Sequence, residues 1–301
     1  MKYAFDIGGS KIEFGVFAGD HSLIAQHKIA TPATDLDAFI AALSGLVGAA
    51  DRESGLRPDI GISFAGGIDP MDGAVITANV PALKGWPIAA ELSRLFDRKV
   101  AIANDADCFA LAEAHLGAGQ GCRTVFGIIL GTGVGGGIVV DGRLLGGRSG
   151  ICGEWGHGND MSGALARHGL AAHPCGCGGA SCLDPWGAAR GLERIHAQCH
   201  GVPLPSHDIT ANWRAGDPAA TRSMDIFIDL LAGPLAGMVN VLDPDCVPVG
   251  GGLASETALI DRIDQEVRRR VLGRYDVPLV VPGVFYRDGG LRGAGLLGDR
   301  A

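Results

Sequence analysis

The chemistry-bearing residues with the closest spacing are three cysteines of one loop, Cys175, Cys177 and Cys182. Glycines between them let the backbone wrap around an ion, and thiolates are preferred ligands of zinc. Tetrahedral zinc needs a fourth ligand, and the nearby candidates are His157, His168 and His173. Three thiolates and one histidine leave no open position for water, so the pattern predicts a structural zinc site. The alternative interpretation is three free thiols.

A carboxylate that could act in catalysis, Asp105, stands between an apolar strand predicted over 100–103 and a helix predicted over 106–116. Open α/β sheets bind their ligands at such strand ends. An aspartate there can accept the proton of a hydroxyl group while that group attacks a phosphate. In a simpler interpretation Asp105 only caps the helix, and Asp107 is a first-turn charge that the helix dipole favours.

Two glycine-rich turns could bind phosphate groups through their backbone N–H groups. The first is Asp6-Ile7-Gly8-Gly9-Ser10-Lys11, where Asp6 could hold Mg²⁺ directly or through water. A tight hairpin turn is the other interpretation of this motif. The second is Gly131-Thr132-Gly133-Val134-Gly135-Gly136-Gly137, whose five glycines weaken a strand but allow a triphosphate to approach closely. Neither turn is a P-loop, because no Gly-Lys-Ser/Thr follows.

The elements that must position these residues alternate between strands and helices, which indicates an α/β class. Strands are predicted over 2–7, 12–17, 58–64, 100–103, 124–130, 136–140 and 246–249. Further helices are predicted over about 35–51, 218–241, 255–271 and 288–299. The strand–glycine turn–strand unit of the N-terminus recurs at 124–140, which predicts two similar lobes. We expect a small lobe of residues 1–116, to which the helix at 288–301 returns, and a large lobe of residues 117–287 with the zinc loop.

Composition and charge exclude several classes of protein. The 301 residues are 47% hydrophobic, which supplies a sizeable core, and the net charge of −8 argues against general nucleic-acid binding. The longest charge-free apolar run, Val125–Val140, is short for a membrane span and contains glycines. No signal-peptide pattern is present at the N-terminus. The five remaining cysteines are scattered, which favours free thiols in a reducing cytoplasm.

Together, over almost the whole chain, these motifs resemble the ROK group of bacterial repressors and sugar kinases. The resemblance is carried by both glycine turns, the cysteine cluster, Asn104–Ala110, Gly153-Glu154-Trp155-Gly156-His157 and Val249-Gly250-Gly251-Gly252. It implies a two-lobed actin-like ATPase (ribonuclease H-like) fold with an interlobe cleft. It also implies Mg²⁺- and ATP-dependent phosphorylation of a hexose at the 6-hydroxyl. N-acetyl-D-glucosamine is the first candidate, because residues 78–82 and 243–245 are similar to members that act on this sugar.

The resemblance implies a role for each matching residue. Asp105 would be the base, and His157 would be the fourth zinc ligand, which would join the metal to the wall of the sugar pocket. The implied sugar-binding residues are Gly66, Asn79, Asn104, Asp105, Glu154, His157 and Asp184. The implied nucleotide-binding residues are Asp6, Gly8, Gly9, Ser10, Lys11, Gly131, Thr132, Gly133, Val134, Gly135, Gly136, Gly250 and Gly251.

Three departures from the family pattern all fall on the sugar side. Asp184 stands where the family usually has glutamate, two residues after the last zinc cysteine. Residues 185–189 differ from the usual sequence, and Ser63-Phe64-Ala65-Gly66 replaces the usual Gly-Ile-Pro-Gly. The sugar could therefore be another hexose, namely glucose, fructose, mannose, allose or N-acetylmannosamine.

Other functions are weighed against the kinase. A non-catalytic sugar sensor conflicts with the intact Asp105 and the two glycine turns. A repressor of the same group would carry a helix-turn-helix segment ahead of the first glycine turn, for which we expect no room before Asp6. A zinc hydrolase would need an open coordination position. Members of the group are often dimers, so the resemblance also makes a homodimer an expectation.

Overall fold

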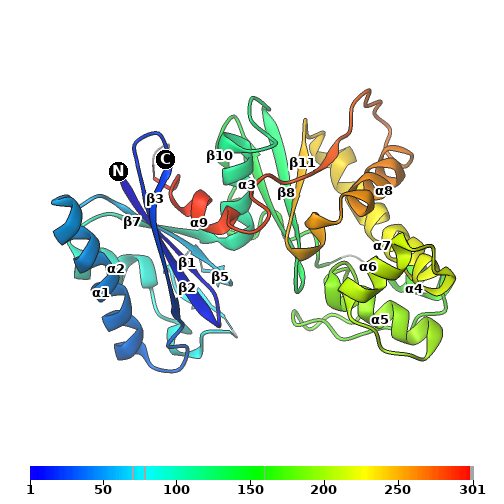
Figure 1. Ribbon diagram of the computed structural model, residues 1–301, viewed down its shortest axis with the longest axis horizontal. Coiled ribbons are helices and arrows are strands. Elements are labelled where there is room, and N and C mark those ends of the chain that lie inside the picture. The colour runs from blue at the N-terminus through cyan, green and yellow to red at the C-terminus, as the bar shows by residue number, and fades with distance from the viewer. Residues whose placement is uncertain (70, 78, 159, 299–301) are drawn as a thin grey trace. The chain divides into compact units, whose positions relative to one another are not determined.

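The computed structural model describes residues 1–69, 71–77, 79–158 and 160–298, whose helices and strands are drawn in Figure 1. The chain forms two compact units. The first comprises Met1–Ala112, Arg143–Cys152 and the described residues from Asp288 onward, and the second comprises Glu113–Gly142 and Gly153–Arg287. Both units are discontinuous in sequence, whereas the sequence predicts one boundary near residue 116 and one return of the C-terminal segment.

A five-stranded sheet with the order β3-β2-β1-β4-β7 forms the centre of the first unit. Strands β1 (Lys2–Ile7) and β2 (Lys11–Phe17) make an antiparallel hairpin, which β3 (Leu23–Ala30) extends. Strands β4 (Ile60–Phe64) and β7 (Val100–Asn104) run parallel to β1. Because parallel strands end at the same edge of a sheet, the ends of β1, β4 and β7 lie side by side.

Helices cover the apolar faces of this sheet. Helix α1 (Leu36–Ser54) begins at Asp35, whose side chain accepts a hydrogen bond from the backbone N–H of Ala38, and α2 (Ile88–Phe96) packs into the same core. Helix α3 (Asp105–Leu116) starts directly after β7. The chain direction therefore places Asp105 where a strand ends and a helix begins.

The short helix α9 (Gly289–Ala294) packs against β1 and β4 of the first unit. The approach is so close that a Cβ atom on Gly61 of β4 would lie 1.7 Å from the carbonyl oxygen of Ala294. Only glycine permits this contact. The helix is shorter than the predicted 288–299, and Gly298 beyond it has a left-handed φ of 85°.

The second unit repeats the strand pairing of the first. Strand β8 (Thr124–Leu130) pairs antiparallel with β9 (Val134–Val140) and parallel with β11 (Val247–Gly250), and β12 (Val280–Pro282) follows β11 in parallel. In the same way β1 pairs antiparallel with β2 and parallel with β4. Each unit thus has a hairpin whose glycine turn joins two strands of its sheet.

Helix α7 (Pro218–Leu242) is the core helix of the second unit and packs against α5 (Ala189–His200), α6 (Ser206–Arg214) and α8 (Thr257–Arg268). Among the described residues it alone is long and apolar enough to cross a membrane, by length and composition only. Half of its apolar window is buried inside the unit. A buried core helix passes the same test, and the packing of α7 is of that kind.

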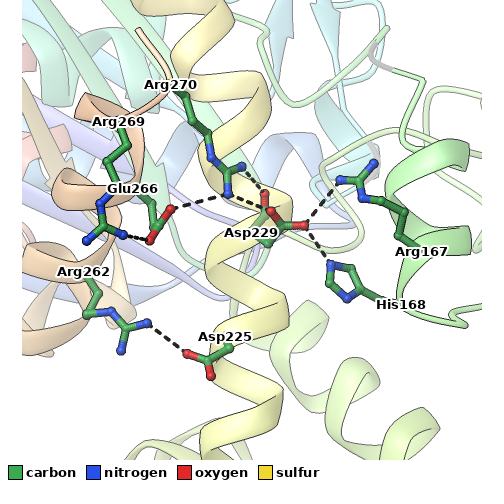
Figure 2. Close-up of polar contacts among 8 residues, drawn as sticks. All are labelled: Arg167, His168, Asp225, Asp229, Arg262, Glu266, Arg269 and Arg270. Atoms are coloured by element: carbon green, nitrogen blue, oxygen red, sulfur yellow. Dashed lines mark hydrogen bonds and ion pairs between the residues drawn. The ribbon is translucent and has the colours of Figure 1, made fainter.

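An ion-pair network centred on Asp229 joins α7 to its neighbours, as Figure 2 shows. Its carboxylate is 2.7 Å from Nε2 of His168, which follows α4 (Ser162–Arg167), and 2.7 Å from Nη2 of Arg270, which follows α8. Burial opposes ionisation of this carboxyl, but the hydrogen bonds from His168 and Arg270 outweigh it and lower the pKa of Asp229. The network connects α4, α7 and the end of α8 through charged side chains.

The remaining described elements are short. They are β5 (Gly67–Ile68), β6 (Val75–Ile76), β10 (Arg143–Leu144) and two 3₁₀ turns over Pro81–Leu83 and Gly252–Ser255.

Candidate active site

The three cysteines of the predicted metal loop converge with one histidine. The ligand atoms of His157, Cys175, Cys177 and Cys182 all lie within 4.8 Å of one another. Nδ1 of His157 is 3.4 Å from Sγ of Cys175, and Sγ of Cys177 is 3.5 Å from Sγ of Cys182. Three sulfur donors and one nitrogen donor fit a closed tetrahedral zinc site. Of the candidate histidines, His168 instead bonds Asp229 (Figure 2), and His173 is outside this cluster.

The backbone of the loop explains how the thiols meet. The N–H of Cys175 donates to the carbonyl of Gly179 over 2.7 Å, and Gly178 adopts a φ of 93° that favours glycine. Burial raises the pKa of the Cys175 thiol to about 12, whereas the backbone N–H of Gly179 lowers the pKa of Cys177 to about 7. The exposed thiol is thus the easiest of these two to ionise, and a metal would hold both as thiolates.

The segment that carries Glu154 and His157 lies on strand β9. Nε1 of Trp155 donates to the carbonyl of Gly135 over 2.9 Å, and a Cβ on Gly153 would lie 2.4 Å from the carbonyl oxygen of Gly136. Nε2 of His157 is 3.7 Å from Oε2 of Glu154, while its Nδ1 faces the cysteines. One imidazole ring therefore joins the metal cluster to a carboxylate.

The second glycine turn is closely packed against its surroundings. The N–H of Gly131 donates to the carbonyl of Gly133 over 3.1 Å, and the carbonyl of Gly131 accepts from the N–H of Ala189 over 3.2 Å. Gly251, with a φ of 87°, approaches so closely that a Cβ there would lie 2.5 Å from the carbonyl oxygen of Leu130. Gly251, directly after β11, and the first residues of the turn therefore lie side by side.

Asp184 is hydrogen-bonded to this turn. Its Oδ1 accepts from the backbone N–H of Val134 over 2.8 Å, and its own N–H donates to the carbonyl of Gly156 over 2.9 Å. The residue predicted to bind sugar thus already has one carboxylate oxygen occupied by the backbone of the predicted nucleotide turn.

In the first unit the carboxylate of Asp6 is held at the end of β1. Its Oδ1 accepts from the hydroxyl of Ser63 over 2.7 Å, and a Cβ on Gly290 of α9 would lie 2.9 Å from the same oxygen. Burial raises the pKa of the Asp6 carboxyl above its ordinary value, and the Ser63 hydrogen bond only partly offsets this. A cation such as Mg²⁺ at this carboxylate would favour its ionised form.

Asp105 lies at the end of β7, on the first residue of α3. Both Oδ1 of Asp105, at 3.0 Å, and Oδ1 of Asn104, at 2.8 Å, accept from the N–H of Ala106, and Nδ2 of Asn104 donates to the carbonyl of Gly66 over 3.0 Å. Burial raises the pKa of the neighbouring Cys108 thiol, and the charges of Asp107, Asp6 and Asp105 add to that rise. The carboxylates of Asp6, Asp105 and Asp107 therefore lie near enough to this buried thiol to affect its ionisation.

The first glycine turn closes with a hydrogen bond from the N–H of Gly8 to the carbonyl of Lys11, at 3.0 Å. A Cβ on Gly9 would lie 3.0 Å from Asn79, so these two predicted residues adjoin. The ammonium of Lys11 pairs with Glu13 of β2. Ser10 lies in the turn, and its carbonyl accepts from the N–H of Thr31.

We predict that Asp6→Asn raises the free energy of unfolding at neutral pH while it lowers activity. Because burial raises the pKa of Asp6 in the folded state, its contribution to stability is full at low pH and is lost as pH rises through the folded pKa. The amide removes this loss. If Asp6 holds Mg²⁺ as predicted, the substitution also removes that ligand, whose role can be worth several kcal/mol in the transition state, and kcat/KM should fall by about 100-fold or more.

Urea unfolding from pH 4 to pH 8, without nucleotide or Mg²⁺, measures the first effect. Asp37→Asn, which changes an exposed carboxylate of the same unit, is the control. An Asp6→Asn protein no more stable than wild type at pH 8 would contradict the burial argument.

The predicted site residues thus divide between the two units. The first unit holds Asp6, Gly8, Gly9, Ser10, Lys11, Gly66, Asn79, Asn104 and Asp105. The second holds Gly131–Gly136, Glu154, His157, Asp184, Gly250, Gly251 and the cysteine cluster. The contacts of Ser63 and Gly290 with Asp6, and the anchoring of the Glu154 segment by Trp155, were not predicted from the sequence. A serine within the otherwise apolar strand 60–64 was a signal that could have indicated the first of these.

The structure has two α/β units with the same strand pairing, and each unit has a glycine turn. The second unit also carries a Cys₃His cluster. These features agree with the family to which the sequence is similar. The chain belongs to the ROK family, which matches residues 2–300. The predicted resemblance is therefore confirmed.

Relatives match the chain over almost its whole length, as two examples show. An N-acetyl-D-glucosamine kinase of Yersinia pseudotuberculosis serotype O:1b (strain IP 31758) is 38% identical over 99% of this chain and 98% of its own length. The N-acetylgalactosamine kinase AgaK of Shewanella sp. (strain ANA-3) is 36% identical over 99% of this chain and 96% of its own length.

Two solved structures share the fold. The ROK hexokinase of Thermus thermophilus superposes with a TM-score of 0.86 and 33% identity, over 98% of this chain and 96% of its own. A ROK family glucokinase of Streptomyces griseus, in complex with glucose and AMPPNP, gives a TM-score of 0.78 and 29% identity over 98% of both chains. These likenesses confirm the predicted α/β class with the actin-like ATPase fold.

Proposed function

We propose that this protein transfers the γ-phosphoryl group of ATP to the 6-hydroxyl of N-acetyl-D-glucosamine. That it is a sugar kinase follows from its family and from the kinases to which it is similar over nearly its whole length. The observation that carries the choice of sugar is the 38% identity to an N-acetyl-D-glucosamine kinase over 99% of the chain.

Asp105 is the proposed base. Its place at the start of α3, beyond the end of β7, supports this role because ligands of open α/β sheets bind at such ends. As the sugar oxygen forms its bond to the γ-phosphorus, the bond from that phosphorus to the β–γ bridging oxygen breaks and ADP leaves. The hydroxyl proton passes to the Asp105 carboxylate late in this step.

The proposed nucleotide site uses the two glycine turns. Backbone N–H groups at Gly8, Gly9 and the turn Gly131–Gly136 would hold phosphate oxygens, with Ser10, Lys11, Gly250 and Gly251 beside them. The bound AMPPNP of the Streptomyces griseus glucokinase supports ATP as the donor. The partly buried Asp6 is the carboxylate that would hold Mg²⁺, and the cation would supply charge neutralisation for the phosphates when bound.

The proposed sugar site uses Gly66, Asn79, Asn104, Asp105, Glu154 and His157. Support comes from the contact of His157 with Glu154 on one ring nitrogen and with Cys175 on the other. Zinc is the proposed occupant of the Cys₃His cluster, where it would fix the ring of His157. Because four protein ligands close the site, we assign zinc a structural role.

The alternative is a ROK kinase for another hexose. Two observations favour a direct test of this alternative. One is the 36% identity to an N-acetylgalactosamine kinase, and the other is the departure from the family pattern at Asp184 and Phe64-Ala65. Glucose, fructose, mannose, allose and N-acetylmannosamine are the other candidates, and a non-catalytic sugar sensor is the remaining alternative.

ADP release with Mg-ATP and each sugar separates these possibilities. We expect kcat/KM for N-acetyl-D-glucosamine to exceed that for every other hexose. Preference for another sugar would change the substrate but not the chemistry. No ADP release with any of the sugars would instead favour the sensor.

We further propose a cytoplasmic homodimer that binds neither nucleic acid nor membrane. The eight free cysteines support a reducing compartment, and the net charge of −8 disfavours nucleic acid. The oligomeric state stays a prediction from the family resemblance.

A further inference from the structure

Asp184 joins two parts of the second unit that are far apart in sequence. It follows the last cysteine of the metal cluster by two residues, and its Oδ1 accepts from the N–H of Val134, which lies within the second glycine turn and begins β9. The hydrogen bond is 2.8 Å long and has an ionisable acceptor. Charge-assisted hydrogen bonds of this kind are about twice as strong as neutral ones.

The turn is shaped to receive this carboxylate. A Cβ atom on Gly133 would lie 2.5 Å from Oδ1 of Asp184, so any larger residue would push the carboxylate away. The φ of Gly133 is not in the left-handed region, so conformational freedom alone does not explain this glycine. The close approach of Asp184 does.

The segment that follows Asp184 also lies on the turn. The N–H of Ala189 donates to the carbonyl of Gly131, and a Cβ on Gly187 would lie 2.8 Å from Cγ2 of Val134. The Asp184 hydrogen bond and these contacts of the residues after it therefore connect the metal loop to the turn. The second carboxylate oxygen, Oδ2, is 3.9 Å from Sγ of Cys175, so it faces the cluster.

We propose that Asp184 is a positioning residue for the nucleotide turn, and that its side chain transmits the geometry of the cysteine cluster to the backbone of Gly131–Val134. The aspartate side chain is one methylene shorter than glutamate, and its carboxylate contacts the turn at Val134. This inference rests on the proposed function only in that the turn binds ATP. It assigns Asp184 to the nucleotide side, whereas the resemblance assigns this position to the sugar.

Asp184→Ala removes the acceptor, and Asp184→Asn keeps an oxygen acceptor at the same place. The Kd of AMPPNP and the Kd of the sugar are measured separately by calorimetry. We expect Asp184→Ala to raise the nucleotide Kd by about 10-fold or more, the factor that loss of one hydrogen bond to a charged group corresponds to. Asp184→Asn keeps the acceptor without its charge and should recover about half of the lost binding free energy. The sugar Kd should stay near the wild-type value in both variants.

Asp245→Ala is the matched control. The Asp245 carboxylate also accepts from backbone N–H groups, those of Arg123 and Thr124, but at the opposite end of β8 from the turn. This variant loses two such bonds and should leave the nucleotide Kd unchanged. A second check is Gly133→Ala, which should weaken nucleotide binding in the wild-type background and much less in the Asp184→Ala background, where the clash is absent.

Hydrogen exchange of the Val134 amide gives a readout that does not depend on activity. We expect it to quicken by about 10-fold in Asp184→Ala and upon zinc removal, because the acceptor is lost or displaced. A raised sugar Kd with an unchanged nucleotide Kd in Asp184→Ala would overturn the inference and make Asp184 a sugar ligand. If wild-type protein phosphorylates no sugar, the proposed function fails; if Val134 exchange is unchanged in Asp184→Ala, this inference fails by itself.

Discussion

Asp105→Asn should lower kcat for sugar phosphorylation by roughly 10²–10⁴-fold, the range that a positioned general base contributes. The sugar Kd should remain near the wild-type value, because asparagine keeps the shape and the oxygen that accepts from the N–H of Ala106. Asparagine is also as good a helix N-cap as aspartate. The substitution therefore removes the base and leaves the cap of α3 intact.

Asp107→Asn is the control for this experiment, since it changes an acidic residue in the same first turn of α3. Its loss of charge near the helix N-terminus should lower stability by only about 0.3–1 kcal/mol. Its turnover should stay close to that of the wild type. Pre-steady-state measurement of ADP formation reports the chemical step directly. If Asp105→Asn turned over as fast as Asp107→Asn, Asp105 would be a cap and not the base.

Loss of the metal site is expected to have the second large effect. Cys177→Ser removes one proposed zinc ligand from an exposed position, so its packing cost is small. A ligand present at about 1,000 times its Kd stabilises the fold by about 4 kcal/mol. If zinc contributes a similar amount here, most of that stabilisation should be lost when the variant no longer binds zinc. The sugar Kd should rise by about 10-fold, because the His157 ring that contacts Glu154 loses its anchor.

Bound zinc, melting temperature and sugar Kd are measured on the same samples, with Cys199→Ser as the control. Cys199 is a partly exposed thiol of α5 outside the cluster, and its substitution should change none of the three. Chelation of wild-type zinc should reproduce the Cys177→Ser result. Metal-free protein with full sugar affinity would show that the cluster has no connection to the sugar pocket.

Local patterns explain what could be predicted from the sequence. The glycine turns, the cysteine loop and the Asn104-Asp105 strand end are each encoded within about ten residues, so spacing alone identifies them. Strands β1, β4 and β8 are short, mostly apolar runs, which can be recognised in the sequence. Strand β3 was missed because its exposed, polar residues, such as Gln26 and Lys28, suit an edge strand and carry little apolar signal.

Contacts between distant segments explain what could not be predicted. The sequence does not show which histidine lies beside the cysteines, because this depends on how residues 153–157 pack against β9. His168 could be excluded only from the structure, where it bonds Asp229. The acceptor role of Asp184 depends on Val134, fifty residues earlier. The sequence marked Asp184 as unusual for its family, but only tertiary structure shows which backbone group it contacts.

Phosphorus and proton NMR of the reaction mixture test the central claim most directly. Purified protein is incubated with Mg-ATP and N-acetyl-D-glucosamine, and the product is identified by the coupling of its phosphorus to the protons on C6. The account predicts one ADP for each sugar 6-phosphate formed, and no ADP without sugar. ADP formation that does not depend on sugar, or a phosphate on another hydroxyl, would contradict it.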